Sequence, residues 1–426
     1  MSSLLHLRRF GNASALAGAF ETDPDLAARD VRTQQTALDG ALGPFSAPLA
    51  AELRRLGWQA DDLILGVPSI REAWIREHGP LPQVRGVEDP DLLLALGEIQ
   101  RTRPEVVLDG NLNVIDRTTS AYLRTQVPAV RLLVGRMGTA KRFHRALHLD
   151  VILTPCHVMA DALRPLVSGA VNVLPHSFNP AVLDTLPPRS IERPLIFTGT
   201  LGPRYVERHR VLMALLESTP IEAYFGLRKG VVGRDDETLA PPTSAAGRSL
   251  AGRLADALPM SVLRTGALKD DRFADHFNAR VVTLFGGTIP PVLPLEDPAV
   301  RFPERCHPPL AGRAHLELLR GSGVVVHREG DDMDTCGGAL RLFEVTGVGS
   351  VLLADASAML GQLFVDGREV LLYDSPEDGV EKARWLLGHP KERDEIAAAG
   401  QARTLRDHTT AVRASQLAEL LSHALR

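Results

Sequence analysis

Short runs of leucine and β-branched residues alternate with segments of helical periodicity along most of this 426-residue chain. Such alternation is typical of βαβ units, which build a parallel sheet with helices on its faces. In the first half we expect strands at residues 4–7, 63–66, 106–108, 129–134, 151–154 and 171–174. Helices are expected between them at residues 48–56, 92–102 and 158–167. Gly57 follows the first of these helices and suits a left-handed stop.

A proline-stiffened stretch, Leu186-Pro187-Pro188-Arg189-Ser190, interrupts this pattern. The alternation then restarts, with strands expected at residues 195–198, 221–225, 324–327, 351–354 and 370–373. Two successive α/β halves predict two doubly wound, Rossmann-like domains that face a cleft, at residues 1–186 and 191–407. An amphipathic helix is expected at 408–426. Residues 228–309 are rich in proline, and we assign them to the second domain without placing strands in them.

Composition and missing motifs exclude several functional classes. A net charge of −4 gives no reason to expect nucleic acid as a partner. No stretch approaches the roughly 18–20 apolar residues of a membrane span. The N-terminal apolar run is too short for a signal peptide, so we expect a cytoplasmic protein. The three cysteines lack CxxC spacing, and the HExxH, Walker and GxGxxG motifs are absent, so neither a metal nor a bound cofactor is expected.

A glycine-opened helix is expected from Gly337 to Gly347, followed by a tight turn and a buried strand. Two glycines in a first turn cost up to about 1 kcal/mol each relative to alanine. Gly337 and Gly338 also allow a ligand to approach free backbone N–H groups, which bind phosphate at helix N-termini. The alternative is a flexible loop that happens to precede a helix.

Arg341 and Glu344 stand three residues apart on this helix and therefore share one face. The carboxylate is in the last turn, where the helix dipole disfavours negative charge. A carboxylate in that place suits the vicinal hydroxyls of a ribose, and arginine suits a phosphate. The alternative is a surface ion pair, worth roughly 0.2–0.5 kcal/mol.

The second half opens with a strand that ends in the small residues Thr198-Gly199-Thr200, and Arg204, Arg208 and Arg210 follow. Small residues permit close approach of a ligand, and arginines can neutralise a diphosphate. The alternative is a tight turn before a solvated basic helix.

Three further polar residues stand near the carboxyl ends of expected strands, where ligands bind in such sheets. His327 ends the strand at 324–327, His176 follows the last strand of the first domain, and Arg136 follows the strand that ends at Val134. A lone histidine is more often structural than functional, so both readings stay open for the two histidines.

About a hundred C-terminal residues carry an ordered set of motifs. Arg341-Leu342-Phe343-Glu344 is followed by Gly347, by Asp355 after the next strand, and by segments 363–370, 373–375, 396–400 and 408–413. In these motifs the chain resembles the donor-binding domain of GT-B-fold glycosyltransferases, most closely the CgeB-like branch of spore-maturation proteins. A weaker likeness extends to residues 197–201 and 174–176, and residues 1–150 match only as a generic α/β half.

The resemblance implies transfer of a sugar from a nucleotide-diphosphate sugar to an acceptor in the interdomain cleft, without an obligatory metal. Glu344 would hold the donor ribose. The other residues implied in donor binding are Gly199, Thr200, Gly337, Gly338, Ala339 and Leu340. The residues implied in catalysis, which offset charge on the departing diphosphate, are Arg204, Arg208, His327 and Arg341. Those implied on the acceptor side are Arg136 and His176.

One position departs from the family pattern. Cys336 stands eight residues before Glu344, where many retaining enzymes of this fold have a second glutamate. A thiol cannot replace that carboxylate, so the sugar and the stereochemical outcome stay open, as does the choice of a UDP-, GDP- or dTDP-linked donor. Two alternatives remain: a nucleotide-sugar 2-epimerase, and a non-catalytic GT-B-like binding or assembly protein. No motif identifies the acceptor.

Overall fold

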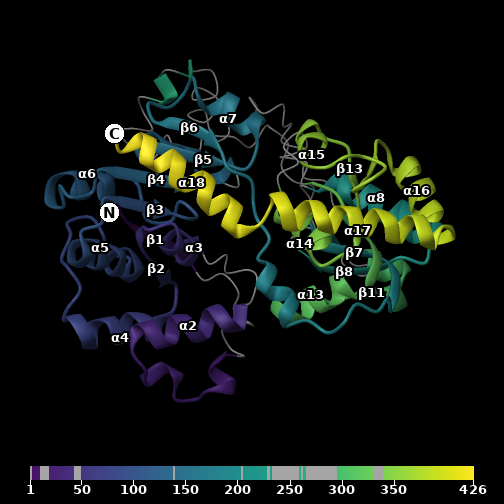
Figure 1. The fold of residues 1–426 in the computed structure, drawn as a ribbon, viewed down its shortest axis with the longest axis horizontal. Helices are drawn as coiled ribbons and strands as arrows, with labels where there is room; N and C mark the ends of the chain where they lie inside the picture. The colour runs from purple at the N-terminus through teal and green to yellow at the C-terminus, as the bar shows by residue number, and fades with distance from the viewer. Residues whose placement is uncertain are drawn as a thin grey trace. The chain divides into compact units, whose positions relative to one another are not determined.

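The computed structural model describes residues 2–9, 19–42, 49–137, 140–202, 205–227, 231–232, 259–260, 262–264, 295–329 and 339–426. This part of the chain forms two compact units (Figure 1). The first contains the described residues up to Pro175, those at 259–260 and 262–264, and those from Thr410 to Arg426. The second contains the other described residues, from His176 to Thr409. Both ends of the chain therefore belong to one unit.

The first unit is built on a six-stranded parallel sheet with the order β2-β1-β3-β4-β5-β6. Its strands are β1 (Ser3–Arg9), β2 (Gln59–Leu65), β3 (Val106–Asp109), β4 (Leu132–Arg136), β5 (Val151–Thr154) and β6 (Ala170–Val173). Its α-helices are α2 (Val31–Leu42), α3 (Leu49–Arg55), α4 (Pro68–His78), α5 (Pro90–Thr102), α6 (Arg117–Gln126), α7 (His157–Leu163) and α18 (Thr410–Ala424). Short 3-10 segments are η1 (Leu26–Ala28) and η3 (Ala140–His148).

Every strand expected in the first half is confirmed within a few residues. Strands β3 and β5 are buried along their whole length, as interior strands of a parallel sheet are, and they therefore read as continuous apolar runs. Gly57 has a φ of +87°, which confirms the left-handed stop after α3. Strand β4 continues to Arg136, so the expectation that this arginine follows the strand is wrong by two residues.

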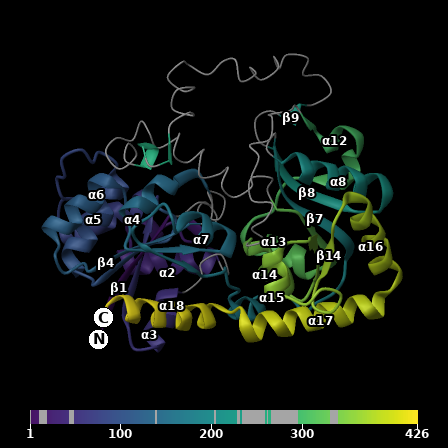
Figure 2. The same ribbon diagram turned by 90° about the horizontal axis from the view of Figure 1, so that it is seen from above.

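The last helix of the chain, α18, covers part of the first sheet (Figure 2). Its apolar positions Ala414, Leu417 and Leu421 are fully buried in one cluster with Leu53 of α3 and Trp58. The amphipathic pattern at 408–426 therefore marks a core element, because its apolar stripe closes the cluster over the strands.

The second unit is built on another six-stranded parallel sheet, with the order β11-β8-β7-β12-β13-β14. Its strands are β7 (Arg193–Leu201), β8 (Glu222–Leu227), β11 (Cys306–His307), β12 (Ser322–His327), β13 (Val351–Asp355) and β14 (Leu371–Tyr373). Strands β9 (Val231–Val232) and β10 (Leu295–Glu296) form a separate parallel pair. The α-helices are α8 (Val206–Ser218), α12 (Pro298–Arg301), α13 (Gly312–Arg320), α14 (Leu340–Gly347), α15 (Ala358–Leu363), α16 (Pro376–Gly388) and α17 (Pro390–Asp407). The 3-10 segments are η4 (Pro180–Asp184) and η7 (Pro303–Arg305).

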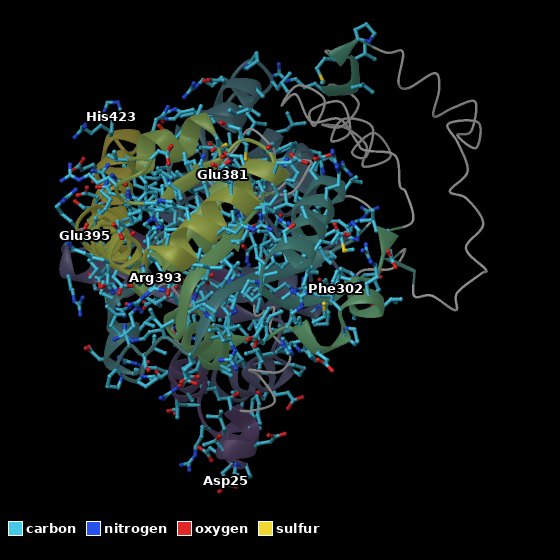
Figure 3. All side chains as sticks on the ribbon, turned by 90° about the vertical axis from the view of Figure 1, so that its right-hand side faces the viewer. Asp25, Phe302, Glu381, Arg393, Glu395 and His423 are labelled. Carbon is cyan, nitrogen blue, oxygen red and sulfur yellow. The ribbon has the colours of Figure 1, made fainter. Side chains whose placement is uncertain are left out.

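The five strands expected in the second half are confirmed, and β9, β10 and β11 fall in the region 228–309 where the sequence placed none. These three are two residues long, too short to carry a periodic signal. Exposed charged residues such as Glu381 and Glu395 lie at the outside of the ribbon (Figure 3).

Residues on alternate sides of the second sheet pack against different helices, because successive side chains of a strand point to opposite faces. Leu195 and Phe197 belong to the cluster that includes residues of α8 and α16. The intervening positions of β7 and β12 include Thr198 and His327, which are buried outside that cluster. Helices α13 and α14 both contact β12. The pleat therefore brings Thr198 and His327 to the face that α13 and α14 cover.

Among the described helices, none combines the length and the apolarity that a bilayer crossing needs.

Candidate functional site

Most of the sequence-predicted residues that the structure describes in the second unit gather near the carboxyl end of its sheet. Strand β7 ends at Leu201, β12 at His327 and β13 at Asp355, and α14 begins at Leu340 after the loop that follows β12. The helix is shorter than the sequence predicted, because its N-cap residue is Ala339 rather than a residue before Gly337. Gly337, Gly338 and Cys336 lie outside the described residues, and so does Arg204.

Glu344 is a buried carboxylate with unfilled hydrogen-bonding capacity. Glu344 is 4% exposed. Its Oε2 lies 3.5 Å from Arg341 Nη1 and 3.9 Å from His315 Nε2. Its Oε1 has no hydrogen-bond partner in the part of the chain that the structure describes. Burial raises the pKa of Glu344, and the charges of Arg341 and His327 oppose that shift. The alternative of a surface ion pair with Arg341 is therefore wrong.

His315 of α13 contacts Arg341, and its burial keeps the imidazole ring neutral. Burial, followed by the charge of Arg341, lowers the pKa of His315 to about 2. Arg341 Nη1 contacts His315 Nε2, so the neutral ring accepts at Nε2 and carries its proton on Nδ1. The histidine thus holds Arg341 without competing for the Glu344 carboxylate. Sequence reasoning missed His315 because nothing in the α13 pattern distinguishes it from a core residue.

Three buried polar atoms on this side of the sheet lack a hydrogen-bond partner among the described residues. They are Glu344 Oε1 on α14, His327 Nε2 on β12 and Thr198 Oγ1 on β7. Strands β7 and β12 are neighbours in the sheet, with Phe197 opposite Val326. Thr198 and His327, one residue further along each strand, therefore lie side by side. Buried polar groups are nearly always paired, and three without partners at one sheet edge indicate a ligand site.

Glu329, two residues beyond β12, is a second buried carboxylate of the site. Its Oε1 accepts a hydrogen bond from the Ala339 N–H at 3.0 Å, at the start of α14. Its Oε2 lies 3.9 Å from His327 Nε2, too far for a hydrogen bond. Burial alone would raise the pKa of Glu329, but His327, the Ala339 N–H and Arg208 lower it overall. A carboxylate of the chain itself therefore occupies the positive end of α14.

The neighbouring backbone is fixed by charged side chains that sequence reasoning did not assign to the site. Arg328 Nη1 lies 2.5 Å from Asp355 Oδ2, and the Glu329 N–H donates to Asp355 Oδ1 at 3.1 Å. The Tyr373 hydroxyl donates to the His327 carbonyl at 2.9 Å. Asp355 was visible in the sequence only as a strand-end carboxylate. These contacts hold the ends of β12, β13 and β14 together.

Arg208 of α8 is brought to the same edge. Its Nη1 donates to the Thr200 carbonyl at 2.9 Å and its Nε to the Arg328 carbonyl at 3.0 Å. These bonds join α8 to the ends of β7 and β12. A Cβ added at Gly199 would lie 3.0 Å from the Phe197 ring, so a larger residue would crowd the strand end.

The two residues predicted on the acceptor side lie in other surroundings. Arg136 is the last residue of β4 and donates to the Pro175 carbonyl at 3.2 Å, as does Arg413 of α18. Burial and the charge of Arg413 lower the pKa of Arg136 to about 10. His176 is half-buried directly after Pro175. Within the described residues, no group of three or more histidines, cysteines or carboxylates could hold a metal ion.

Part of the chain matches a known protein family. Residues 271–419, about a third of the chain, match the family model described as "Glycosyl transferase-like". That segment includes Glu329, Arg341 and Glu344. None of the curated proteins matches the chain.

Several solved structures match over the full length. A sucrose-phosphate synthase from Thermosynechococcus elongatus has a TM-score of 0.53 at 11% identity, over 100% of this chain and 99% of that chain. Anabaena HepE, solved in complex with UDP-glucose, has a TM-score of 0.54 at 13% identity, over 99% and 100%. A glycosyltransferase from Rickettsia africae has a TM-score of 0.53 at 10% identity, over 100% and 99%.

At such low identities these likenesses define the fold. The chain has the GT-B fold of two parallel-sheet α/β domains, and its C-terminal part matches a glycosyltransferase family.

Proposed function

We propose that this protein is a CgeB-like glycosyltransferase that moves a hexose from a nucleotide-diphosphate sugar to an acceptor, without a metal requirement. The observation that carries the proposal is the buried Glu344 Oε1, which has no hydrogen-bond partner within the described residues. An ionised carboxylate is an acceptor only, so its natural complement is a pair of hydroxyl donors, such as those of a ribose. UDP-sugars are the first donors to test, because the matching Anabaena HepE was solved with UDP-glucose.

Arg341 and His315 prepare Glu344 for this role. Burial disfavours the charged carboxylate, whereas Arg341 at 3.5 Å favours it. His315 holds the guanidinium in place from a second helix. Arg341 therefore stabilises the ionised carboxylate through Oε2 and leaves Oε1 available to the donor. Thr198 Oγ1 and His327 Nε2 supply two more unfilled positions at the same edge.

We assign the donor diphosphate to the region between Arg208 and the start of α14. The backbone N–H groups of Ala339 and Leu340, with Gly337, Gly338 and the arginines Arg204, Arg208 and Arg341, would offset its charge as the sugar leaves. Glu329 accepts from the Ala339 N–H, so a diphosphate bound at that amide has to displace this carboxylate. Gly199 and Thr200 would lie beside the donor, and His327 beside the sugar.

The acceptor is assigned to the N-terminal domain, at residues 1–186, with Arg136 and His176 as its nearest polar residues. The donor domain is assigned to residues 191–407, and the helix at 408–426 completes the first domain. We also propose a cytoplasmic location.

A panel of UDP-, GDP- and dTDP-sugars tests the proposal, with thermal shift and nucleotide release as readouts, with and without a chelator. We expect one nucleotide to stabilise the protein and its sugar to be hydrolysed slowly. Glu344→Gln should lose this stabilisation. The matched control is Glu317→Gln, because Glu317 is a partly exposed carboxylate on α13 that pairs with Arg313. Epimer formation without nucleotide release would replace the proposal by a 2-epimerase, and no response to any nucleotide would refute both.

A further inference from the structure

The first sheet has a topological switch point, where the strand order reverses direction, at β1 and β3. Strand β1 pairs with β2 on one side and with β3 on the other, although β2 comes between them in the chain (Figure 1). Ligands of open α/β sheets bind outside the carboxyl ends of the strands at such a point. His6 of β1 lies opposite Leu108, one residue before β3 ends. This histidine therefore stands near the place where the first unit is expected to bind a ligand.

His6 is held by a carboxylate on the neighbouring strand. His6 and Asp62 are opposite each other in the β1–β2 ladder, and His6 Nδ1 lies 2.8 Å from Asp62 Oδ1. Both side chains are mostly buried, at 10% and 16% exposure. An ionised carboxylate only accepts hydrogen bonds, so Nδ1 carries the proton of the neutral ring and Nε2 is the acceptor. Asp62 thus fixes the tautomer in which Nε2 can take up a proton.

Neighbouring bases keep Asp62 ionised. Arg8, two residues after His6 on the same face of β1, places its Nε 3.1 Å from Asp62 Oδ1. Burial alone would raise the pKa of Asp62, but the hydrogen bond and charge of His6 and the charges of Arg8 and Arg54 lower it overall. Arg8 also pairs with Asp39 of α2 at 2.8 Å. The charged groups of this cluster are thus two on the strands, Asp39 on α2 and Arg54 on α3.

The other ring nitrogen of His6 is without a partner. Nε2 makes no hydrogen bond or ion pair within the described part of the chain. A Cβ added at Gly110, directly after β3, would lie 2.8 Å from Nε2, so a side chain at this position would cover the nitrogen. Polar atoms of mostly buried side chains are nearly always paired. An unpaired acceptor at a switch point indicates a ligand that donates a hydrogen bond, such as a hydroxyl.

The strand register also relates His6 to Arg136, one of the two residues proposed on the acceptor side. Leu108 stands opposite both His6 and Val134, and Arg136 follows Val134 by two residues on β4. Residues two apart in a strand point to the same face of a sheet. His6 and Arg136 therefore lie on one face of the first sheet, with β3 between their strands.

We propose that His6 is the base of the sugar transfer and that Asp62 is its positioning residue, an inference that rests on the proposed function. Nε2 takes the proton of the acceptor hydroxyl while the acceptor oxygen forms its bond to the anomeric carbon. The bond from that carbon to the diphosphate oxygen breaks, and its electron pair leaves with the nucleoside diphosphate. Asp62 stabilises the imidazolium, whose proton then passes to solvent.

The test uses the full chain with the nucleotide-sugar that the wild type hydrolyses, and with water and methanol as acceptors. The wild type is compared with His6→Asn, Asp62→Asn and the control Asp61→Asn by nucleotide release at acidic to basic pH and by nucleotide affinity. Asparagine at position 6 can still donate an N–H to Asp62 but is no base. Asp61 is the control, because this adjacent carboxylate is exposed and lies 3.4 Å from Arg54.

We expect His6→Asn to release nucleotide at least about 100-fold more slowly, with unchanged nucleotide affinity. Asp62→Asn should also be slower, and Asp61→Asn should match the wild type. The wild-type rate should fall at acidic pH, because a protonated ring cannot accept a proton, and the residual rate of His6→Asn should lack this fall. A single displacement inverts the anomeric carbon, so the methyl glycoside should have the configuration opposite to that of the donor.

Nitrogen–proton correlation spectra of the histidine rings test the pair without any nucleotide. In its neutral form the His6 ring should carry its proton on Nδ1, and Asp62→Asn, unlike Asp61→Asn, should change that tautomer. A neutral ring with its proton on Nε2 would overturn the proposal.

The outcomes separate this proposal from the proposed function. Wild-type release by His6→Asn, a loss of its nucleotide affinity, or retention of configuration would refute His6 as the base and leave the transferase intact. Absence of release from every nucleotide-sugar by the wild type would refute the transferase, and the base with it.

Discussion

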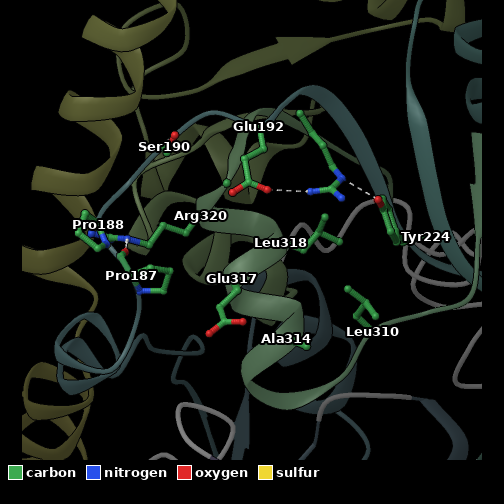
Figure 4. A pocket seen from close by; sticks show the side chains of 12 residues that line it. Pro187, Pro188, Ser190, Glu192, Tyr224, Leu310, Ala314, Glu317, Leu318 and Arg320 are labelled. Atoms are coloured by element: carbon green, nitrogen blue, oxygen red, sulfur yellow. Dashed lines mark hydrogen bonds and ion pairs between the residues drawn. The ribbon is translucent and has the colours of Figure 1, made fainter.

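The two edges of the second sheet differ in how far their polar side chains find partners within the chain. At the carboxyl edge, Glu344 is a buried carboxylate with one unfilled oxygen, beside the unfilled His327 Nε2 and Thr198 Oγ1. At the amino edge, around the pocket in Figure 4, the charged side chains are largely paired: Arg193 lies within ion-pair distance of Glu192 and Glu222, and Glu317 pairs with Arg313. The unfilled groups of the carboxyl edge are therefore the ones that indicate a ligand.

The comparison also shows how differently the two edges deal with buried charge. At the carboxyl edge, Arg341 and Glu329 are satisfied by the chain itself, through His315 and the Ala339 N–H. The site is therefore partly filled by internal groups that a donor has to displace or share. At the amino edge the pairs join partly exposed side chains, such as Arg193 and Glu192, where solvent weakens their attraction.

The largest expected effect is that of Glu344→Gln on nucleotide binding. Loss of a charged acceptor for the ribose hydroxyls should weaken UDP affinity by about 1.5–3 kcal/mol, or roughly 10–150-fold. Calorimetry with UDP measures this loss. Glu317→Gln, at the amino edge, should leave UDP affinity unchanged. An equal loss in both variants would show that the effect does not come from the carboxyl edge.

Glu329→Gln, also at the carboxyl edge, should strengthen UDP binding rather than weaken it. The variant removes the negative charge that occupies the α14 N-terminus, so UDP should bind more tightly by about 1 kcal/mol. Uridine, which has no phosphate, serves as the control ligand and should bind equally to both proteins. Weaker UDP binding by the variant would instead make Glu329 a direct donor contact.

The two carboxylates should change stability in opposite directions with pH. Both have an ordinary pKa near 4.5, which the fold raises for Glu344 and lowers overall for Glu329. The stability from Glu329 is present above pH 4.5 and is lost as pH falls through its lowered folded pKa. That from Glu344 is present below pH 4.5 and is lost as pH rises through its raised folded pKa.

Urea unfolding over a pH range that extends from well below 4.5 to pH 8 checks this difference in sign. Relative to the wild type, Glu344→Gln should gain stability as pH rises, and Glu329→Gln should lose it. Parallel curves for the two variants would contradict the assigned environments.

The smallest expected effect concerns Thr198. Its buried hydroxyl has no hydrogen-bond partner among the described residues, so Thr198→Val should be neutral or stabilising by up to about 1 kcal/mol without nucleotide. The matched variant is Thr219→Val, because the Thr219 hydroxyl is buried and donates to the Leu215 carbonyl at 2.7 Å. That variant should lose about 1 kcal/mol. Equal losses in chemical unfolding would mean that Thr198 is satisfied in solution.

Much of the fold could be predicted because its signals are local. Interior strands such as β5 read as apolar runs, and Gly57 marks a helix end by its own conformational freedom. The start of α14 was placed too early, because the glycines suggested a first turn, whereas the helix begins at Leu340 with Ala339 as its N-cap. The Ala339 N–H donates to Glu329, which lies outside the helix.

The site was predictable only where a residue breaks a local rule. Glu344 stood out as a carboxylate near a helix C-terminus, and strand ends pointed to His327. Nothing local marked His315, which reads as one more position on α13, or Glu329, which stands in an acidic loop sequence. Their roles depend on partners distant in the chain, Arg341 and Ala339.

The sequence by itself determined two parallel α/β halves and the helix that carries Glu344, because apolar periodicity and glycine placement act over a few residues. Only the tertiary structure decided that Glu344 is buried with an oxygen that has no partner among the described residues, and that Glu329 accepts a hydrogen bond at the start of α14. It also decided that α18 returns to the first sheet. Charge pairing and burial depend on which distant segments meet, and the pattern along a single segment does not contain that information.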